Sequence, residues 1–195
     1  EHHVSTQALD SLVRSLREEF QNRARGGRMA ELLGEYARAE SDWREFALFS
    51  PRHYTRNLVE RAPSFELMIL CWGPGQESAI HNHEGQDCWM AVLSGAIEEV
   101  RYAWPTSGGS APIQQGNAMT FVQGQVAFIR DEMGLHLVRP AAGSPNGITL
   151  HLYASPYDEC NCYCPRTGQV TRKKLGHHSV RGRVLTESAP DRLAP

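Results

Sequence analysis

Residues 87–104 read DCWMAVLSGAIEEVRYAW, a run of β-branched, aromatic and other apolar residues that Ser94 and Gly95 interrupt. Runs of the same kind recur before and after it, at 65–72, 118–129, 134–140 and 147–154. Short stretches rich in Gly, Pro, Ser and Asn separate them, and this spacing is typical of an antiparallel sandwich or barrel. No helical pattern lies between the runs, which argues against a parallel α/β sheet. The sequence therefore predicts a mainly β protein, a small jelly-roll-like barrel.

The first fifty residues have a different pattern. Apolar residues recur there at the three- and four-residue spacing of an amphipathic helix, at Leu9, Leu12, Val13, Leu16 and Phe20. Shorter amphipathic stretches follow at 29–33 and 43–48. We expect residues 1–50 to form helices packed against the barrel, residues 51–182 to form the barrel, and residues 183–195 to form an irregular tail. The 195 residues suit one domain, since a domain takes roughly 150 residues.

Composition narrows the class of protein. The formal net charge is −2 and the basic residues are scattered, so nothing favours a nucleic acid partner. The longest apolar run, 67–72, is far shorter than the ~20 residues of a membrane-spanning helix. Five cysteines, an odd number without a secretion signal, favour free thiols in a reducing compartment. We expect a monomer in the cytoplasm that binds neither nucleic acid nor membrane.

A pair of histidines stands just before the quoted run, in the segment AIHNHEGQD. His81 and His83 are two residues apart, so on a strand their side chains point to the same side. A single buried histidine is more often a hydrogen-bonded core residue than a ligand, but two on one face favour a metal site. His136 lies about fifty residues on, where an antiparallel barrel can bring it opposite the pair. Asp87 offers a carboxylate alternative if the register shifts by one residue.

The spacing Gly75-x5-His81-x-His83-x4-Cys88-x6-Gly95 resembles the first sequence motif of the cupin superfamily, with Gly134-x-His136 as a loose second motif. Most cupins have Glu, a fourth metal ligand, where this chain has Cys88. With that replacement the sequence resembles the cysteine dioxygenase family in particular. Further segments match this family between residues 43 and 182, namely YTRNLV (54–59), LMILCWG (67–73), LHLY (150–153), RTG (166–168) and HS (178–179).

The resemblance implies a cupin fold and oxidation of L-cysteine by O2 to the sulfinic acid. It implies Fe(II) held by His81, His83 and His136, and three neutral imidazoles leave that ion its full charge and open positions for a thiolate and O2. Zinc would also accept three histidines but has no redox chemistry. Oxygen attack on the bound sulfur would lead to the sulfinic acid.

The resemblance also assigns the substrate pocket. Arg56 would bind the carboxylate of the substrate, because a planar guanidinium recognises a carboxylate bidentately. Without the motif, Arg56 would be read as an ordinary surface residue. Tyr54 shares a face with Arg56 if the segment is extended, and it has a supporting place in the pocket with Trp72 and Cys160.

Thr149, His151 and Tyr153 alternate along one predicted strand and therefore face one side. They match the family's Ser-His-Tyr relay, with Thr in place of Ser, and the alternative is a wet barrel face with unrelated polar residues. The family joins the cysteine at the Cys88 position to this tyrosine through a thioether, so the resemblance implies a Cys88–Tyr153 crosslink. The family's Tyr-Ser-Pro-Pro is Tyr-Ala-Ser-Pro here, and the missing first proline puts in doubt the cis peptide beside the family's active site.

Other readings stay open. Cys160, Cys162 and Cys164, with His177 and His178 downstream, offer a second metal site, although their one-residue spacing is unlike that of structural zinc sites. The substrate could be another small thiol acid, such as 3-mercaptopropionate. A noncatalytic cupin that senses a metal or ligand is a different class, as is a zinc- or nickel-dependent isomerase or decarboxylase, which usually keeps the Glu ligand.

Overall fold

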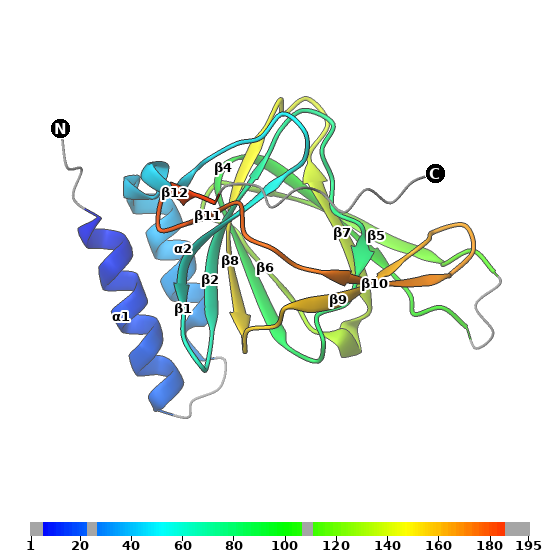
Figure 1. The fold of residues 1–195 in the computed structure, drawn as a ribbon, viewed down its shortest axis with the longest axis horizontal. Helices are drawn as coiled ribbons and strands as arrows, with labels where there is room; N and C mark the ends of the chain where they lie inside the picture. Colours follow the sequence, from blue (N-terminus) through cyan, green and yellow to red (C-terminus); the bar gives the residue numbers. More distant parts are fainter. Residues whose placement is uncertain (1–5, 23–26, 107–110, 186–195) are drawn as a thin grey trace.

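The computed structural model describes residues 6–22, 27–106 and 111–185 (Figure 1). Two α-helices and a 3-10 helix precede the sheet, at α1 (Gln7–Gln21), α2 (Met29–Ala39) and η1 (Asp42–Phe46). The strands are β1 (Thr55–Arg61), β2 (Glu66–Trp72), β3 (Ile80–His81), β4 (Asp87–Tyr102), β5 (Gln115–Val122), β6 (Val126–Ile129), β7 (Leu135–Pro140), β8 (Gly147–Ala154), β9 (Glu159–Tyr163), β10 (Val170–Lys174), β11 (Ser179–Val180) and β12 (Arg183–Val184). A short 3-10 helix, η2 (Asp131–Met133), precedes β7.

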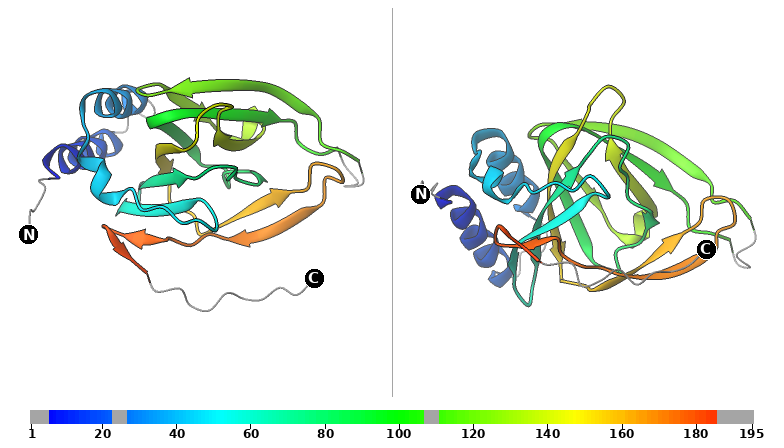
Figure 2. Two further views of the ribbon diagram at one scale, coloured as in Figure 1. Left: turned by 90° about the horizontal axis from the view of Figure 1, so that it is seen from above. Right: turned by 45° about the horizontal axis from the view of Figure 1, so that its top comes forward.

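The strands form one rolled sheet in the order β10-β9-β3-β7-β4-β8-β2-β1-β11-β12, with β5 and β6 paired to β4. Among the described residues every pairing is antiparallel except that of β1 with β11. Figure 2 shows two layers of strands that face each other across the interior. The prediction of a mainly β, jelly-roll-like fold with N-terminal helices is confirmed.

β4 carries the chain from one layer to the other. Its first half pairs with β8 and β6, and its second half pairs with β7 and β5. Between the halves the register with β8 shifts, and Gly95 has φ 76°. A Cβ atom at Gly95 would lie 2.5 Å from the carbonyl oxygen of Asn146, so this bend requires glycine.

The layer of β2, β8 and β4 has two different faces. α1 and α2 cover its outer face (Figure 1), where Leu16 and Leu33 pack with residues such as Leu67 and Leu152. The periodic apolar residues of the helices are therefore explained by burial against the sheet. The inner face carries the side chains that alternate with these, including Met68 and the buried polar residues of β8.

The irregular tail was predicted to begin at residue 183, but the last strand of the structure extends to Val184. Arg183 and Val184 form β12, a short strand paired with β11, and β11 in turn is held beside β1. Ser179 donates a buried hydrogen bond of 2.7 Å to the amide oxygen of Asn57, which anchors β11 to the barrel. Residues 186–195 of the predicted tail lie outside the described residues.

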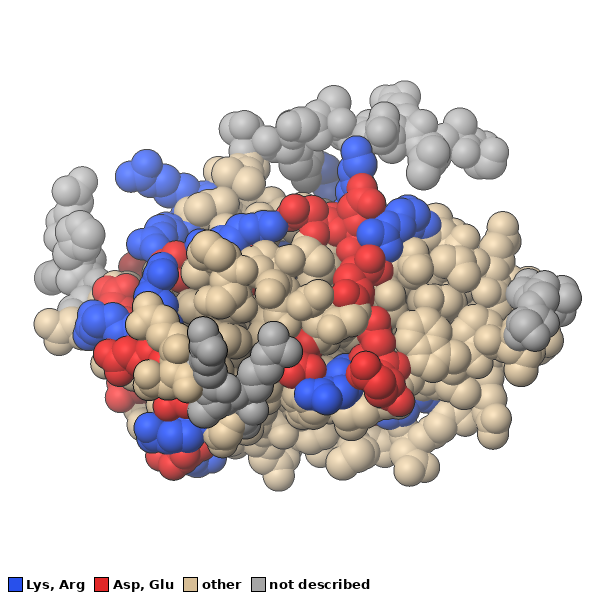
Figure 3. All heavy atoms as spheres, turned by 90° about the horizontal axis from the view of Figure 1, so that it is seen from below, with Lys and Arg blue, Asp and Glu red and all other residues tan. Residues whose placement is uncertain are grey.

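Charges of both signs lie on the surface. On the face shown in Figure 3, acidic side chains form a column with basic side chains beside it, and an uncharged area adjoins them. No broad basic surface appears on this face, in agreement with the net charge of −2. The described part of the chain contains no helix long and apolar enough to span a membrane.

Candidate metal centre and pocket

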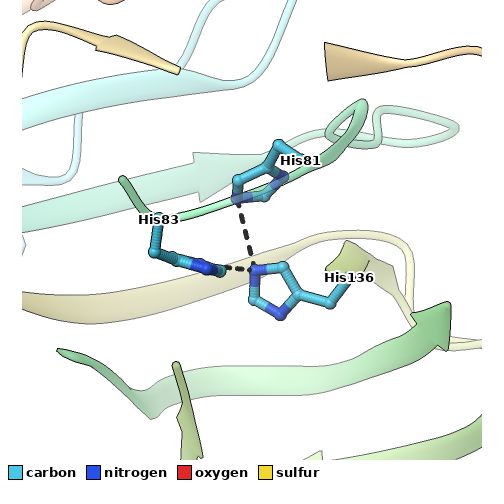
Figure 4. Close-up of side chains that lie close together, drawn as sticks. All are labelled: His81, His83 and His136. Carbon is cyan, nitrogen blue, oxygen red and sulfur yellow. Dashed lines mark hydrogen bonds between the residues drawn. The ribbon is translucent and has the colours of Figure 1, made fainter. Parts of the chain in front are cut away.

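The three histidines named from the sequence meet at one point inside the barrel. His81 ends β3, His83 follows it, and His136 lies opposite His81 on β7. The Nε2 atom of His136 is 3.1 Å from Nε2 of His83 and 3.2 Å from Nε2 of His81 (Figure 4). Nitrogens bound about 2.1 Å from one metal ion are roughly 3.0–3.4 Å apart at right to tetrahedral angles. The spacing therefore fits one shared ion.

Burial keeps these imidazoles uncharged. It lowers the pKa of His81 to about 3, and it holds the pKa of His136 well below its usual value and lowers that of His83. Nδ1 of His81 lies 2.8 Å from the carbonyl oxygen of Ala79, so the hydrogen sits on Nδ1 and the lone pair on Nε2. Neutral imidazoles with Nε2 lone pairs directed to one point are suited to hold a metal.

Glu99 was not recognised from the sequence. Its carboxylate lies 2.6 Å from Nδ1 of His136, and both side chains are buried. This contact places the hydrogen of His136 on Nδ1 and leaves Nε2 free to bind a metal. The other oxygen of Glu99 is 3.1 Å from Nε of Arg101, an ion-pair contact whose geometry is poor for a hydrogen bond. Burial raises the pKa of Glu99, and Arg101 opposes that shift.

Asp131, at the start of η2, holds the loop that carries His83. Its carboxylate accepts the backbone N–H of His83 and of Gly85, each at 2.7 Å. Burial acts to raise the pKa of Asp131, but the imidazole of His83 together with these two backbone N–H groups outweighs it and leaves the pKa lowered. Asp131 lies five residues before His136 in the chain, so one short segment orients two of the three histidines.

A pocket opens beside the cluster. The predicted substrate-binding residues all line it, namely Tyr54, Arg56, Trp72 and Cys160, as do His151 and Tyr153. Nη1 of Arg56 is buried and has no hydrogen-bond partner among the described residues. Tyr54 stacks on Trp72 with ring centroids 4.5 Å apart. Side chains that the sequence analysis did not place there also line it, including Tyr157, Cys162 and Lys173.

Thr149, His151 and Tyr153 form a hydrogen-bonded row on the inner face of β8. Nε2 of His151 is 2.9 Å from the hydroxyl of Thr149, and Nδ1 of His151 is 3.2 Å from the hydroxyl of Tyr153. The indole N–H of Trp72 donates to Thr149 at 2.9 Å. The alternative of an unrelated wet face does not fit, because all three side chains are buried.

Cys88 stands beside Tyr153. The two residues are direct partners in the pairing of β4 with β8, so their side chains share the inner face, and both are buried. Burial raises the pKa of the Cys88 thiol and of the Tyr153 phenol. The next partner of Tyr153, on β2, is Glu66.

The alternative ligands lie elsewhere. Asp87 pairs with Arg130 at 3.0 Å and does not join the cluster. Within the described ranges, the three histidines form the one group of His, Cys, Asp or Glu side chains close enough to share an ion, so Cys160, Cys162 and Cys164 do not build a second metal site. All five cysteines are free, as expected.

The peptide bond between Ala154 and Ser155 is cis, although the missing proline had put it in doubt. Because Ser155, unlike proline, has a backbone N–H, it donates a hydrogen bond of 2.6 Å to the side chain of Gln86. Gln86 in turn donates to the carbonyl oxygen of Glu84 at 3.1 Å. The end of β8 is thereby tied to the loop that carries His83.

A rolled double-layer sheet with histidines of β3 and β7 directed into a pocket defines the chain as a cupin that can hold a metal ion. The family model of cysteine dioxygenase type I matches residues 1–166. The chain belongs to the cysteine dioxygenase type I family.

Curated relatives agree with this assignment. Cysteine dioxygenase type 1 of Danio rerio is 32% identical over 181 residues, which span 92% of this chain and 90% of the relative. The Rattus norvegicus protein is 33% identical over 181 residues, with the same coverage of 92% and 90%. The human protein is 34% identical over 152 residues, 77% of this chain and 76% of the relative.

Solved structures also resemble the chain. A Klebsiella pneumoniae protein with a double-stranded β-helix domain matches with TM-score 0.47 and 17% identity, covering 70% of this chain and 98% of that one. A RmlC-like cupin protein from Desulfovibrio desulfuricans matches with TM-score 0.44 and 21% identity, covering 56% and 90%.

Proposed function

We propose that the protein is a non-haem Fe(II) thiol dioxygenase that oxidises L-cysteine with O2 to L-cysteine sulfinic acid. The observation that carries this proposal is the donor set, three neutral imidazoles without a carboxylate ligand, beside Arg56, whose buried Nη1 atom has no hydrogen-bond partner among the described residues. Membership of the cysteine dioxygenase type I family supports the substrate.

His81, His83 and His136 would hold the iron. When bound, the ion would supply a site for the substrate thiolate and the redox chemistry that O2 requires. The chain's own part is to keep the ligand Nε2 atoms unprotonated, through Glu99 and the carbonyl of Ala79, as their contacts indicate.

Arg56 would fix the substrate by its carboxylate. Its Nη1 atom is buried and has no partner in the described part of the chain, so a bidentate carboxylate would satisfy a group that otherwise costs free energy. Tyr54 and Trp72, stacked on each other, form an apolar wall beside it. A substrate held at its carboxylate has fewer orientations available to its thiol.

The hydrogen bonds from Trp72 to Tyr153 indicate which atom of each side chain carries the hydrogen. Thr149 accepts from Trp72, so its own O–H is satisfied when it donates to Nε2 of His151. Nδ1 of His151 then carries the hydrogen and donates to the phenol oxygen of Tyr153. The O–H of Tyr153, whose raised pKa keeps it protonated, is left to donate into the pocket.

Reconstitution without oxygen tests the function. The protein is loaded with Fe(II), and separately with Zn(II), and O2 uptake and product mass are measured with cysteine, 3-mercaptopropionate and cysteamine. We expect uptake with iron only, a sulfinic acid product, and the highest kcat/KM with cysteine. A higher kcat/KM for 3-mercaptopropionate would identify that thiol acid as the substrate in place of cysteine. Iron binding without O2 uptake would favour a noncatalytic cupin.

Arg56→Ala is expected to raise KM for cysteine at least about tenfold, because hydrogen bonds to a charged group contribute roughly 1.5–3 kcal/mol. Turnover of cysteamine, a cation without a carboxylate, should stay constant or rise. Steady-state O2 uptake measures both. An unchanged KM for cysteine would remove Arg56 from the substrate site.

We also propose a thioether between Sγ of Cys88 and the ring of Tyr153, a step that removes two hydrogens during iron- and O2-dependent turnover. Their direct pairing across β4 and β8 supports it. After aerobic turnover, intact-mass analysis should show a species lighter by two hydrogens in the wild type and in Cys164→Ser, a control at a residue outside the pocket lining. Cys88→Ser should bind iron yet lack the lighter species, and its persistence there would refute the pairing.

The oligomeric state and the compartment stay predictions, a monomer in the cytoplasm. Sedimentation of the purified chain tests the first.

A further inference from the structure

The hairpin of β9 and β10 contributes a cation to the pocket. Lys173 lies directly opposite Cys160 in this hairpin, and both residues line the pocket together with Cys162. Side chains alternate along a strand, so the neighbours Arg172 and Lys174 face the other side. Arg172 is neutralised there by Glu84 at 2.7 Å and by Glu159 at 3.1 Å.

The charged side chains that line the pocket are all positive. It contains two cations, Arg56 and Lys173, and no described aspartate or glutamate. No carboxylate of the described residues forms an ion pair with Lys173. Arg56 has a buried nitrogen, whereas Lys173 is exposed, so the two cations stand at different depths of one cavity.

We propose that Lys173 is a second carboxylate-binding residue, at the outer part of the pocket, and that it sets the preference for thiols that carry a carboxylate. The inference rests on the proposed function and deepens it. Arg56 holds the carboxylate in the reacting position, and Lys173 adds attraction for the same group across the open side of the pocket. The carboxylate of cysteine or of 3-mercaptopropionate thus meets one sign of charge throughout, while cysteamine, a cation without a carboxylate, gains nothing from either residue.

A rival role for Lys173 is to act on the thiol of Cys162, whose pKa falls to about 7 through its hydrogen bond with Cys160 and through Lys173. The two roles differ in one respect. Carboxylate binding by Lys173 does not need the thiol, so its effect persists in a Cys162→Ser background.

The test compares Lys173→Met with Lys174→Met, a matched loss of charge one residue away on the opposite face of β10. For the iron-loaded enzyme, Lys173→Met should lower kcat/KM for cysteine and for 3-mercaptopropionate about three- to fivefold at low ionic strength, the size expected of an exposed charge. The loss should appear in KM and in the Kd of cysteine measured calorimetrically without O2, not in kcat. The loss should shrink at high salt, and Lys173→Arg should have a kcat/KM close to that of the wild type.

Cysteamine should respond differently from cysteine: its kcat/KM should stay constant or rise in Lys173→Met. The proposal is overturned if Lys173→Met and Lys174→Met behave alike, if cysteamine loses as much as cysteine, or if the effect vanishes in the Cys162→Ser background. Failure of the proposed function is distinct, because the wild type would then not consume O2 with any of these thiols.

Discussion

His136→Ala is expected to abolish metal binding and O2 uptake. His136 supplies the Nε2 atom that lies within 3.2 Å of both other ligand nitrogens, so its loss leaves two imidazoles and no convergent set. Two neutral imidazoles without a carboxylate provide too few donors for tight binding. Metal content after anaerobic reconstitution and desalting, measured by mass spectrometry, is the readout.

His53→Ala is the matched control. His53 is exposed, its Nδ1 lies 2.9 Å from the carbonyl oxygen of Tyr54, and it is not one of the three clustered histidines, so this variant should bind a full equivalent of metal. His136 is buried over Glu99, and its removal also disturbs the fold. His81→Ala therefore serves as the second variant, because His81 is only partly buried. Full metal occupancy in either ligand variant would exclude that histidine from the site.

Glu99→Leu is expected to weaken metal binding by roughly 10- to 100-fold, the usual cost of losing a residue that orients a metal-ligating histidine. The leucine removes the acceptor of the His136 hydrogen, so the imidazole loses its fixed orientation and its assigned hydrogen. Glu99→Gln keeps an amide oxygen as acceptor and should lose less. Competition with a chelator of known affinity measures both variants.

The neighbouring Glu98→Gln is the control, because Glu98 pairs with Arg139 at 2.7 Å on the opposite face of β4. Glu99→Leu also leaves Arg101 without its carboxylate. Thermal unfolding of the metal-free variants separates that cost to the fold from the loss of affinity. If Glu99→Leu binds metal as tightly as the wild type, Glu99 has no orienting role.

Strand alternation accounts for much of what could be predicted. The apolar runs of β2, β4, β7 and β8 are visible because one or both faces of each strand are buried. β10 has no such pattern, because all its residues are exposed, and the sequence analysis therefore assigned no strand there. The tail was placed too early for the same reason, because both residues of β12 are exposed.

Part of the candidate site could likewise be predicted from strand alternation, and part could not. The rows His81–His83 and Thr149–His151–Tyr153 follow from the two-residue period of one strand, which holds whatever the strand packs against. Glu99 stands in the segment EEVR, where nothing in the sequence distinguishes this buried acid from its partly exposed neighbour Glu98. Only the pairing of β4 with β7 turns Glu99 inward to His136.

The sequence by itself determined the fold class, the family and the histidines, because these depend on local periodicity and on motif spacing within single strands. The tertiary structure alone decided that Glu99 orients His136, that Trp72 begins the row to Tyr153, and that Lys173 enters the pocket. Those contacts join strands separated by tens of residues. Their geometry follows from sheet register and from the bend at Gly95, and a one-residue change of register would turn each side chain to the other face.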